Sequence, residues 1–249
     1  MGFLNKIFSK NKALDEAIDF GLIHTDIHSH LIPGIDDGSR DMADSIAMLK
    51  ALSNLGYKKI ITTPHILSDL YPNSKEIILA GFEKVKLAIE KEKIPIELEA
   101  ASEYYFDDHF IDLIERDELL SFGDKKILFE LPFVQEPMDL DKTIFDLQLA
   151  GYTPVLAHPE RYSYWHEDFK RYQKLFNKDV ILQVNINSLS GYYSAEVQKI
   201  AEKLIDLNMV QLIGTDIHHL GQIENLKASA KSYYLKKLLD SGELLNRQL

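Results

Sequence analysis

LIHTDIHSHLIPGIDDG, residues 22–38, indicates the class of fold to which this chain belongs. It begins with Leu22–Ile27, a short apolar run of the length expected for a buried strand. Two histidines, His28 and His30, follow this run directly, and a Gly- and Asp-containing turn comes next. Beyond the turn, apolar residues recur at helical spacing over residues 42–52, with Ser39 expected as the N-cap and Gly56 as the stop. The pattern predicts a strand, a polar turn and then a helix.

The same alternation continues along the chain. Six more candidate strands are Lys59–Thr63, Ile96–Ser102, Ile127–Leu131, Pro154–Ala157, Val180–Val184 and Val210–Gly214. Amphipathic segments lie between them, two of which follow Ser74 and Ser194. Strands that alternate with helices predict an α/β fold with a parallel sheet, and near-continuous apolar strands suit burial on both faces. No linker divides the chain, so we expect residues 21–249 to form one barrel of seven parallel strands, preceded by an extension over residues 1–20.

Composition excludes several classes of protein. The chain has 249 residues, of which 45% are hydrophobic and 27% charged, as in soluble globular proteins. Its net charge of −11 disfavours nucleic-acid binding. It has no cysteine, which excludes disulfides, thiolate metal sites and a cysteine nucleophile. We find neither a secretory signal nor an apolar run that could span a membrane, and we expect a cytoplasmic protein in which the amphipathic residues 1–12 pack on the barrel.

Histidines and acids follow six of the seven predicted strands, and this is the main functional signal. In a parallel barrel these positions open onto one rim, where active sites are built. The residues expected there are His28, His30, Asp37, His65, Glu103, Glu130, His158, Asp216 and His218.

Imidazoles and carboxylates without thiols suit Mn, Zn or Fe. A single strand-end histidine is more often structural than catalytic, so each piece alone is a weak signal. Together, four carboxylates at one rim would repel one another and raise their pKa values unless cations lie among them. Three divalent ions would leave a net charge of about +2, which favours a phosphate ligand.

Six motifs carry a family resemblance. They are DIHSHLIPGIDDGSRD (26–41), ITTPH (61–65), SEYY (102–105), LFELP (128–132), LAHPERY (156–162) and GTDIHH (214–219). Together they resemble the polymerase and histidinol phosphatase (PHP) family, and within it the bacterial manganese-dependent protein-tyrosine phosphatases of capsule and exopolysaccharide operons. The resemblance implies a distorted TIM-like (β/α)7 barrel. It also implies hydrolysis of phosphotyrosine on a bacterial tyrosine kinase that regulates capsule or exopolysaccharide synthesis.

The resemblance further implies how the ligands divide among three ions, for which manganese is favoured and iron and zinc also fit. The first ion takes His28, His30, Glu103 and Asp216; the second takes Glu103, Glu130 and His158; the third takes Asp37, His65 and His218. Arg161 would grip the phosphate through its planar guanidinium, and it joins Asp216 and His218 as a catalytic residue. Arg40 and Tyr104 are additional candidates for substrate binding.

A water shared between two ions is the expected nucleophile. Alternatives to the tyrosine phosphatase are another PHP phosphoesterase, such as a histidinol-phosphate phosphatase, and a non-catalytic metal-binding adaptor of the export machinery. The oligomeric state stays open.

Overall fold

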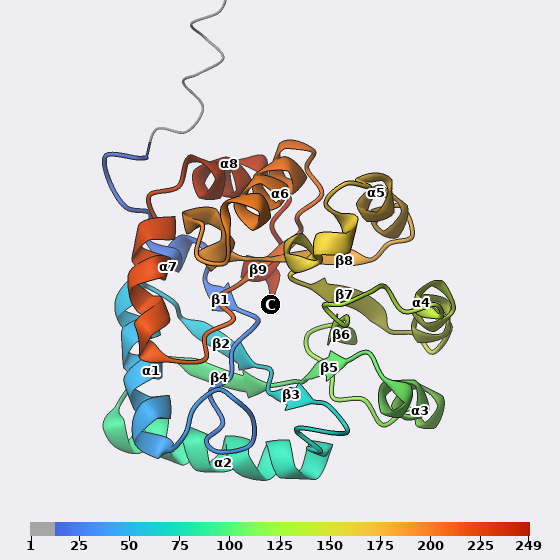
Figure 1. The fold of residues 1–249 in the computed structure, drawn as a ribbon. Coiled ribbons are helices and arrows are strands. Elements are labelled where there is room, and N and C mark those ends of the chain that lie inside the picture. Colours follow the sequence, from blue (N-terminus) through green and yellow to red (C-terminus); the bar gives the residue numbers. More distant parts are fainter. Residues whose placement is uncertain (1–12) are drawn as a thin grey trace, which may run out of the picture.

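Nine short strands, every pair of them parallel, lie at the centre of the computed structural model, which describes residues 13–249 (Figure 1). They form a three-stranded sheet of order β1-β2-β4 and a six-stranded sheet of order β3-β5-β6-β7-β8-β9. The strands are β1 (Thr25–Asp26), β2 (Lys59–Thr62), β3 (His65–Ile66), β4 (Glu97–Ala100), β5 (Glu103–Tyr105), β6 (Lys126–Glu130), β7 (Thr153–Ala157), β8 (Ile181–Asn185) and β9 (Leu212–Gly214). The fold is therefore α/β with parallel sheets, as predicted.

Two of the predicted strands are each followed closely by a second, short strand that the sequence analysis did not predict. Thr63 and Pro64 separate β2 from β3, and Ala101 and Ser102 separate β4 from β5. Proline has no amide hydrogen for a strand ladder. The carbonyl of Pro64 instead accepts hydrogen bonds from the Glu103 amide at 3.2 Å and the Ser102 hydroxyl at 2.9 Å. The prediction of seven strands is wrong here because it lacks β3 and β5, which belong to the six-stranded sheet, whereas β2 and β4 belong to the three-stranded sheet.

The first predicted strand is shorter than expected. Phe20–Leu22 form a 3₁₀ turn, and His24 has a left-handed φ of 74°, so the pairing in β1 is confined to Thr25–Asp26. Beyond β1, Ser29 bridges to Ile217 in parallel. This bridge brings the segment after β1 beside the segment after β9. The ladders alone do not amount to the single closed sheet of a barrel, and that closure stays a prediction.

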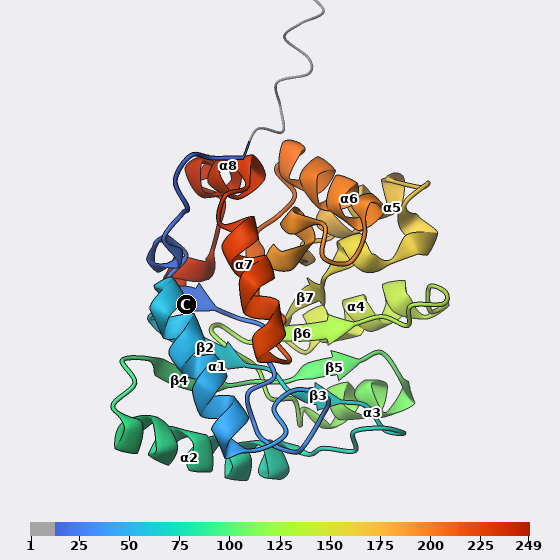
Figure 2. The ribbon, with the colours of Figure 1, turned by 60° about the vertical axis from the view of Figure 1, so that its left-hand side comes forward.

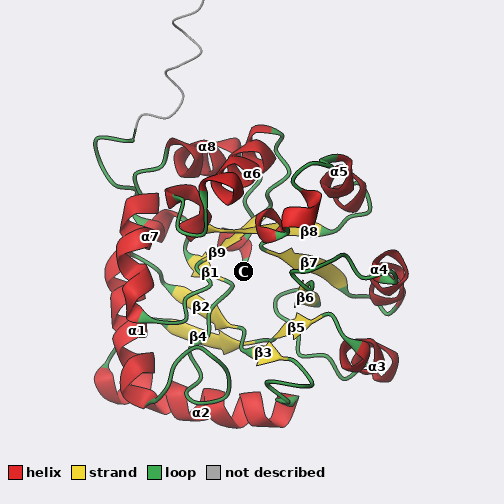
Figure 3. Cartoon of the chain, viewed as in Figure 1, coloured by secondary structure: helices red, strands yellow, loops and turns green. Residues whose placement is uncertain are grey.

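Eight α-helices lie outside the strands in the described part of the chain (Figures 1 and 3). They are α1 (Met42–Leu55), α2 (Lys75–Glu92), α3 (Asp108–Arg116), α4 (Leu140–Leu149), α5 (Lys170–Phe176), α6 (Ala195–Asp206), α7 (Ile223–Ser229) and α8 (Tyr233–Ser241). Figure 2 shows α1 and α7 side by side, in front of the strands. Not one helix within residues 13–249 combines the length and the apolar character that a bilayer crossing requires.

The helix caps are mostly those predicted. Ser74 and Ser194 accept the capping hydrogen bonds of α2 and α6, and Gly56 ends α1 in the left-handed conformation. The N-cap of α1 is Asp41 and not Ser39, because the Asp41 carboxylate accepts the Asp44 amide at 2.9 Å. The Ser39 hydroxyl instead donates to the Asp41 carbonyl at 2.8 Å.

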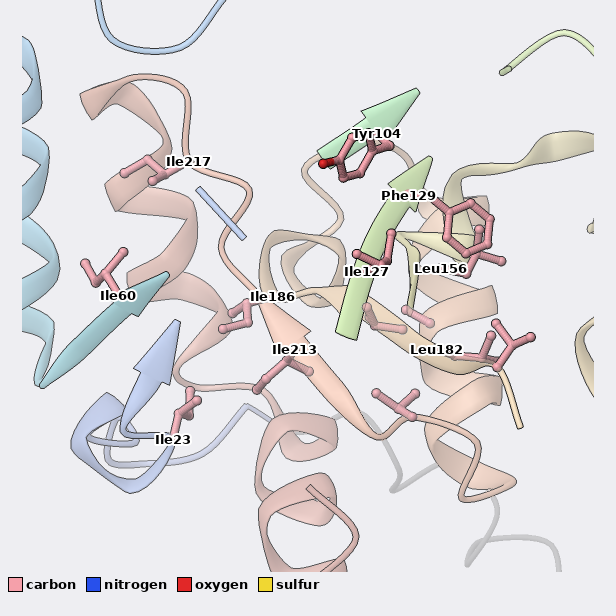
Figure 4. Close-up of a cluster of buried hydrophobic side chains, with 14 of the residues drawn as sticks. Ile23, Ile60, Tyr104, Ile127, Phe129, Leu156, Leu182, Ile186, Ile213 and Ile217 are labelled. Atoms are coloured by element: carbon pink, nitrogen blue, oxygen red, sulfur yellow. The ribbon is translucent and has the colours of Figure 1, made fainter. Parts of the chain in front are cut away.

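Two clusters of buried apolar side chains form the core. The smaller one takes side chains from strands of both sheets, including Ile61, Val155 and Leu212, and Leu245 and Leu249 of the C-terminal segment pack against it. The larger one lies between strands and helices and is partly drawn in Figure 4. The core divides into two clusters because successive side chains along each strand point to opposite faces of the sheet. The polar residues lie at the carboxyl ends of the strands.

The N-terminal extension is described only from residue 13 onward. The amides of Leu14 and Ile18 donate to the carbonyls of Lys231 and Ala230, both at 2.8 Å, and Phe20 is fully buried. The predicted packing of its amphipathic start falls on residues 1–12, outside the described residues.

Candidate metal centre and active site

All nine predicted metal ligands converge at the carboxyl ends of the strands. They fall into four overlapping groups whose potential ligand atoms lie within 4.8 Å of one another: His30, Asp37, His65 and His218; His28, His30 and Asp216; His28, Glu103 and His158; and His65, Glu103 and Glu130. Side chains from positions 28 to 218 therefore meet at one place. These four groups share more residues with one another than the three predicted ligand sets do. The assignment of the ligands to three ions therefore stays a prediction.

Glu103 lies at the centre of these groups. It begins β5 and is fully buried. Its Oε2 atom lies 3.0 Å from His28 Nε2 and 3.3 Å from His65 Nδ1, and its Oε1 atom lies 3.1 Å from His158 Nε2. A carboxylate with imidazoles around both oxygens is placed to bridge two cations.

Asp216 divides its two oxygens between two environments. Its Oδ1 atom lies 3.4 Å from His28 Nε2, 3.5 Å from His30 Nε2 and 3.4 Å from His218 Nδ1. Its Oδ2 atom accepts hydrogen bonds from Asn185 Nδ2 at 2.7 Å, from the Tyr193 hydroxyl at 3.1 Å and from Arg161 Nη1 at 3.2 Å. Since Oδ2 has its partners within the protein, Oδ1 is the atom left to face a cation.

Other polar side chains orient the histidines. The Nδ1 atom of His28 lies 2.8 Å from Gln183 Oε1, and that of His30 lies 2.8 Å from Asp36 Oδ2. If each Nδ1 carries the proton, each Nε2 presents its lone pair toward Glu103 and Asp216. Asp36 thus contacts His30, whereas the half-exposed Asp37 lies beside His65 and His218, and its role as a ligand stays a prediction.

Two ligands occupy unusual backbone conformations. His158 has a φ of 33° and Asp216 a φ of 51°, both in the left-handed region that residues with a Cβ rarely adopt. Each follows a strand, β7 or β9, so the chain turns sharply just where the ligand is needed. Such strain persists only where the surrounding structure enforces it.

The donor set fits divalent cations. His28 Nε2, His30 Nε2, His65 Nδ1 and Glu103 Oε2 are buried and have no hydrogen-bond partner in the protein. Buried polar atoms are almost always satisfied, so unpaired atoms that face one another indicate a missing partner. Imidazole nitrogens and carboxylate oxygens, with no thiolate among them, are ligands for Mn, Fe or Zn.

The electrostatics of the site also call for positive charge. Burial alone would raise the pKa of Glu103, but His28 and His65 hold it well below its ordinary value. Burial and the charge of Glu103 raise the pKa of Glu130 well above its ordinary value. Burial, together with Arg161, lowers the pKa of His158 to about 4, which keeps its imidazole neutral and able to bind a cation.

A cavity of about 470 Å³ opens above the cluster. Glu103, Glu130, His158, Asp216 and His218 line it, together with Arg161. The Arg161 guanidinium lies 4.8 Å from the ring centre of Phe133 and 4.4 Å from that of Tyr193. Two rings and Asp216 therefore hold the planar guanidinium of Arg161 beside the cluster, where it can bind an anion through two hydrogen bonds.

The profile of the family described as "Capsular polysaccharide synthesis, CpsB/CapC" matches residues 24–241. The chain belongs to the CpsB/CapC family. The match includes all nine predicted ligands and Arg161.

Individual members of the CpsB/CapC family are similar over most of their length. The tyrosine-protein phosphatase YwqE of Bacillus subtilis is 31% identical over 232 residues, which cover 89% of this chain and 91% of YwqE. CapC of Staphylococcus aureus is 28% identical over 230 residues, which cover 88% of this chain and 90% of CapC. A chain from the crystal structures of YwqE and of CpsB from Streptococcus pneumoniae, described as unique metal-dependent tyrosine phosphatases, matches with a TM-score of 0.79, 31% identity and 86% of each chain covered.

Two predicted substrate-binding residues of this CpsB/CapC protein, Arg40 and Tyr104, do not line the cavity that contains Arg161. The Arg40 side chain is 84% exposed, and its guanidinium pairs with Asp44. It lines a neighbouring depression and not the cavity that contains Arg161.

Tyr104 is fully buried in the larger core cluster (Figure 4). Its ring stacks on Phe110, and its hydroxyl accepts the Leu120 amide at 2.6 Å. The prediction that Tyr104 binds substrate is wrong. Because Tyr104 directly follows Glu103 in β5, its side chain must point to the opposite face of the strand.

Sequence reasoning did not assign a role to five residues that shape the site: Tyr71, Phe133, Gln183, Asn185 and Tyr193. All but Gln183 lie in or beside loops that follow strands. That position is the only feature of the sequence that could have indicated a role in the site. Glu160 was also missed. Its buried carboxylate accepts the Asn185 amide at 2.9 Å and the Ser188 hydroxyl at 2.6 Å, and it ties the loop after β7 to the loop after β8.

Proposed function

We propose that this CpsB/CapC protein is a metal-dependent protein-tyrosine phosphatase. The observation that carries the proposal is the convergence of nine imidazole and carboxylate ligands beneath a cavity that also contains the fixed guanidinium of Arg161. The similarity to YwqE, named a tyrosine-protein phosphatase, supports the same reaction.

We propose that the site holds three divalent cations, with manganese favoured. Cations bound there would supply positive charge to the phosphoryl oxygens and would activate water. The protein's own contribution is to keep the ligand side chains in place before any cation binds. Gln183 and Asp36 fix the imidazoles of His28 and His30 in this way.

Arg161 binds the phosphoryl oxygens in this proposal, since its guanidinium lines the cavity and Asp216, Phe133 and Tyr193 hold it in place. The leaving tyrosine has an unperturbed pKa of about 10, far below that of a serine hydroxyl, so its departure needs little help from a general acid. The chain contains no cysteine, which excludes a phosphocysteine intermediate.

We also propose the finer points that the sequence suggested. The bridge between Ser29 and Ile217 supports a distorted (β/α)7 barrel over residues 21–249 as the catalytic unit. Membership of a capsular polysaccharide synthesis family supports, as substrate, a phosphotyrosine protein such as a bacterial tyrosine kinase that regulates capsule or exopolysaccharide synthesis, and action in the cytoplasm.

The test is hydrolysis of a phosphotyrosine peptide by purified, manganese-loaded protein. We expect turnover that chelation abolishes and that Arg161→Ala lowers by at least about 100-fold. The matched control is Arg116→Ala, which removes an exposed arginine of α3 and should retain full activity. Absence of turnover with the ions bound, or faster hydrolysis of histidinol phosphate, would contradict the proposal.

A further inference from the structure

Two aromatic rings stack on histidines of the metal centre. The ring of Tyr71 lies 5.7 Å from that of His65, with 14° between their planes. The ring of Phe133 lies 5.9 Å from that of His158, with 18° between their planes. Tyr71 follows β3 and Phe133 follows β6, so the two rings come from different loops, and both line the cavity.

The two histidines flank one pair of carboxylates. His65 Nδ1 lies 3.3 Å from Glu103 Oε2 and 3.4 Å from Glu130 Oε1. His158 Nε2 lies 3.1 Å from Glu103 Oε1 and 3.7 Å from Glu130 Oε2. Tyr71 and Phe133 therefore stand on either side of the Glu103–Glu130 pair. A phosphate ester held in the cavity by Arg161 and by cations bound at this pair would have both rings within the same cavity.

The surface around these rings is apolar and is not covered by the described chain. Phe133 is 42% exposed, and Leu70, which also lines the cavity, is 69% exposed. The loop that carries Leu70 and Tyr71 is held in shape, because the amides of Leu67 and Tyr71 donate to each other's carbonyls at 3.0 and 2.9 Å. Apolar side chains at the mouth of the cavity and charged side chains at its base suit a ligand with one charged end and one aromatic end.

We propose that Tyr71 and Phe133 form the two walls of a subsite for the aryl ring of the substrate, and that this subsite selects aryl over alkyl phosphate esters. The inference rests on the proposed phosphatase function and adds the residues that determine its specificity. Aromatic rings in offset or edge contact attract one another beyond their shared burial, whereas a small alkyl group would leave both walls in contact with water.

The test compares two ligands that share a phosphonate group and differ in the ring. We would measure the Kd values of phenylphosphonate and methylphosphonate by calorimetry on the manganese-loaded full chain. Tyr71→Ala should raise the Kd of phenylphosphonate by about three- to tenfold and that of methylphosphonate by less than twofold. Tyr71→Phe keeps the ring and should bind both ligands as the wild type does. The control Leu87→Ala removes a 64% exposed side chain of α2 and should change neither Kd.

Phe133 needs a separate interpretation, because it also contacts Arg161. Phe133→Ala should weaken both ligands, and phenylphosphonate more strongly. The subsite would be overturned if both alanine variants lost affinity equally for the two phosphonates. It would also be overturned if the wild type bound the two phosphonates with equal Kd values. If Tyr71→Ala does not fold, Tyr71→Leu tests the same wall.

The outcome is distinguishable from that of the proposed function. Suppose that Tyr71→Ala weakens phenylphosphonate binding but the wild type does not hydrolyse phosphotyrosine peptides. The subsite would then be retained and the phosphatase function rejected. Turnover of phosphotyrosine by the wild type, with no effect of Tyr71→Ala on either Kd, would retain the phosphatase and reject the subsite.

Discussion

The Tyr193 hydroxyl donates a hydrogen bond to Asp216 Oδ2 at 3.1 Å, while the Tyr193 ring lies 4.4 Å from the guanidinium of Arg161. One side chain thus contacts both a metal-ligand candidate and the candidate phosphate-binding residue. Asn185 and Arg161 donate to the same oxygen, which leaves Asp216 Oδ1 to face the imidazoles. Tyr193 is a positioning residue for both groups, and its two contacts can be separated by mutation.

Tyr193→Phe keeps the ring and removes the hydroxyl. We expect kcat to fall by about tenfold, because a hydrogen bond to a charged group contributes roughly 1.5 kcal/mol, while the Kd for inorganic phosphate stays within twofold. Tyr193→Leu also removes the ring beside Arg161 and should weaken phosphate binding as well. Steady-state kinetics and phosphate titration of the two variants check this. Identical behaviour of both variants would show that the two contacts do not act separately.

Gln183→Ala removes the partner of His28 Nδ1. Its carboxamide oxygen lies 2.8 Å from that nitrogen, deep below the cavity, and fixes the ring that faces Glu103. Loss of such an outer partner typically lowers metal affinity by about 10- to 100-fold. We expect that loss in a manganese titration, together with recovery of activity at high manganese concentration. Gln148→Ala removes a side-chain hydrogen bond remote from the cluster and serves as the control; an equal effect there would count against the assignment.

Glu103→Gln tests the central ligand. Four imidazoles surround this carboxylate, so its neutral amide should bind cations poorly, and we expect kcat/KM to fall by more than about 100-fold. In the wild type, the Tm should rise with manganese concentration, because manganese binds the folded state. The variant should lose most of that increase in Tm. A variant with the full increase in Tm would show that Glu103 is not a ligand.

Asp141 offers a pH-dependent test remote from the cluster. Arg171, Lys174 and Lys178 donate to its carboxylate at 3.1, 2.6 and 2.9 Å and connect α4 to the region of α5. Burial alone would raise the pKa of Asp141, but hydrogen bonds from these cations hold it well below its ordinary value.

A carboxyl group whose pKa is lowered by folding stabilises the protein above its unfolded pKa of about 3.9, and this contribution is lost as the pH falls further. Asp141→Asn should therefore lower the Tm at pH 7 by about 1–3 °C, a small effect because the ion pairs are partly exposed. The difference from wild type should shrink between pH 5 and pH 3 in thermal unfolding. A difference that grows with acidification would refute this account, and the exposed Asp124→Asn controls for loss of charge.

The sequence predicted the convergence of the candidate metal ligands because each one lies at the end of a strand or in the turn that follows. Parallel strands place their carboxyl ends together, so no knowledge of distant contacts was needed to bring Glu103, His158 and Asp216 to one place. The same alternation rule could have excluded Tyr104, which follows Glu103 and must face the helices. The break at Pro64 was also readable, since its missing amide is a property of the residue.

The remaining features depend on contacts that local sequence does not encode. Tyr193 meets Asp216 across 23 positions, and Gln183 meets His28 across 155. Phe133 and Tyr71 become opposing walls only because His65 and His158 flank the same carboxylates. Such pairings require the relative placement of loops, whereas hydrophobic periodicity predicts only the elements that carry them.

The left-handed backbones of His158 and Asp216 each cost about 1–3 kcal/mol, which short peptides have no means to offset. Isolated segments bearing the LAHPERY or GTDIHH motif would relax to ordinary conformations and aim these side chains elsewhere. We therefore expect divalent cations to bind only after the tertiary structure is complete. A copy in which these two turns have unfolded should accordingly bind divalent cations poorly.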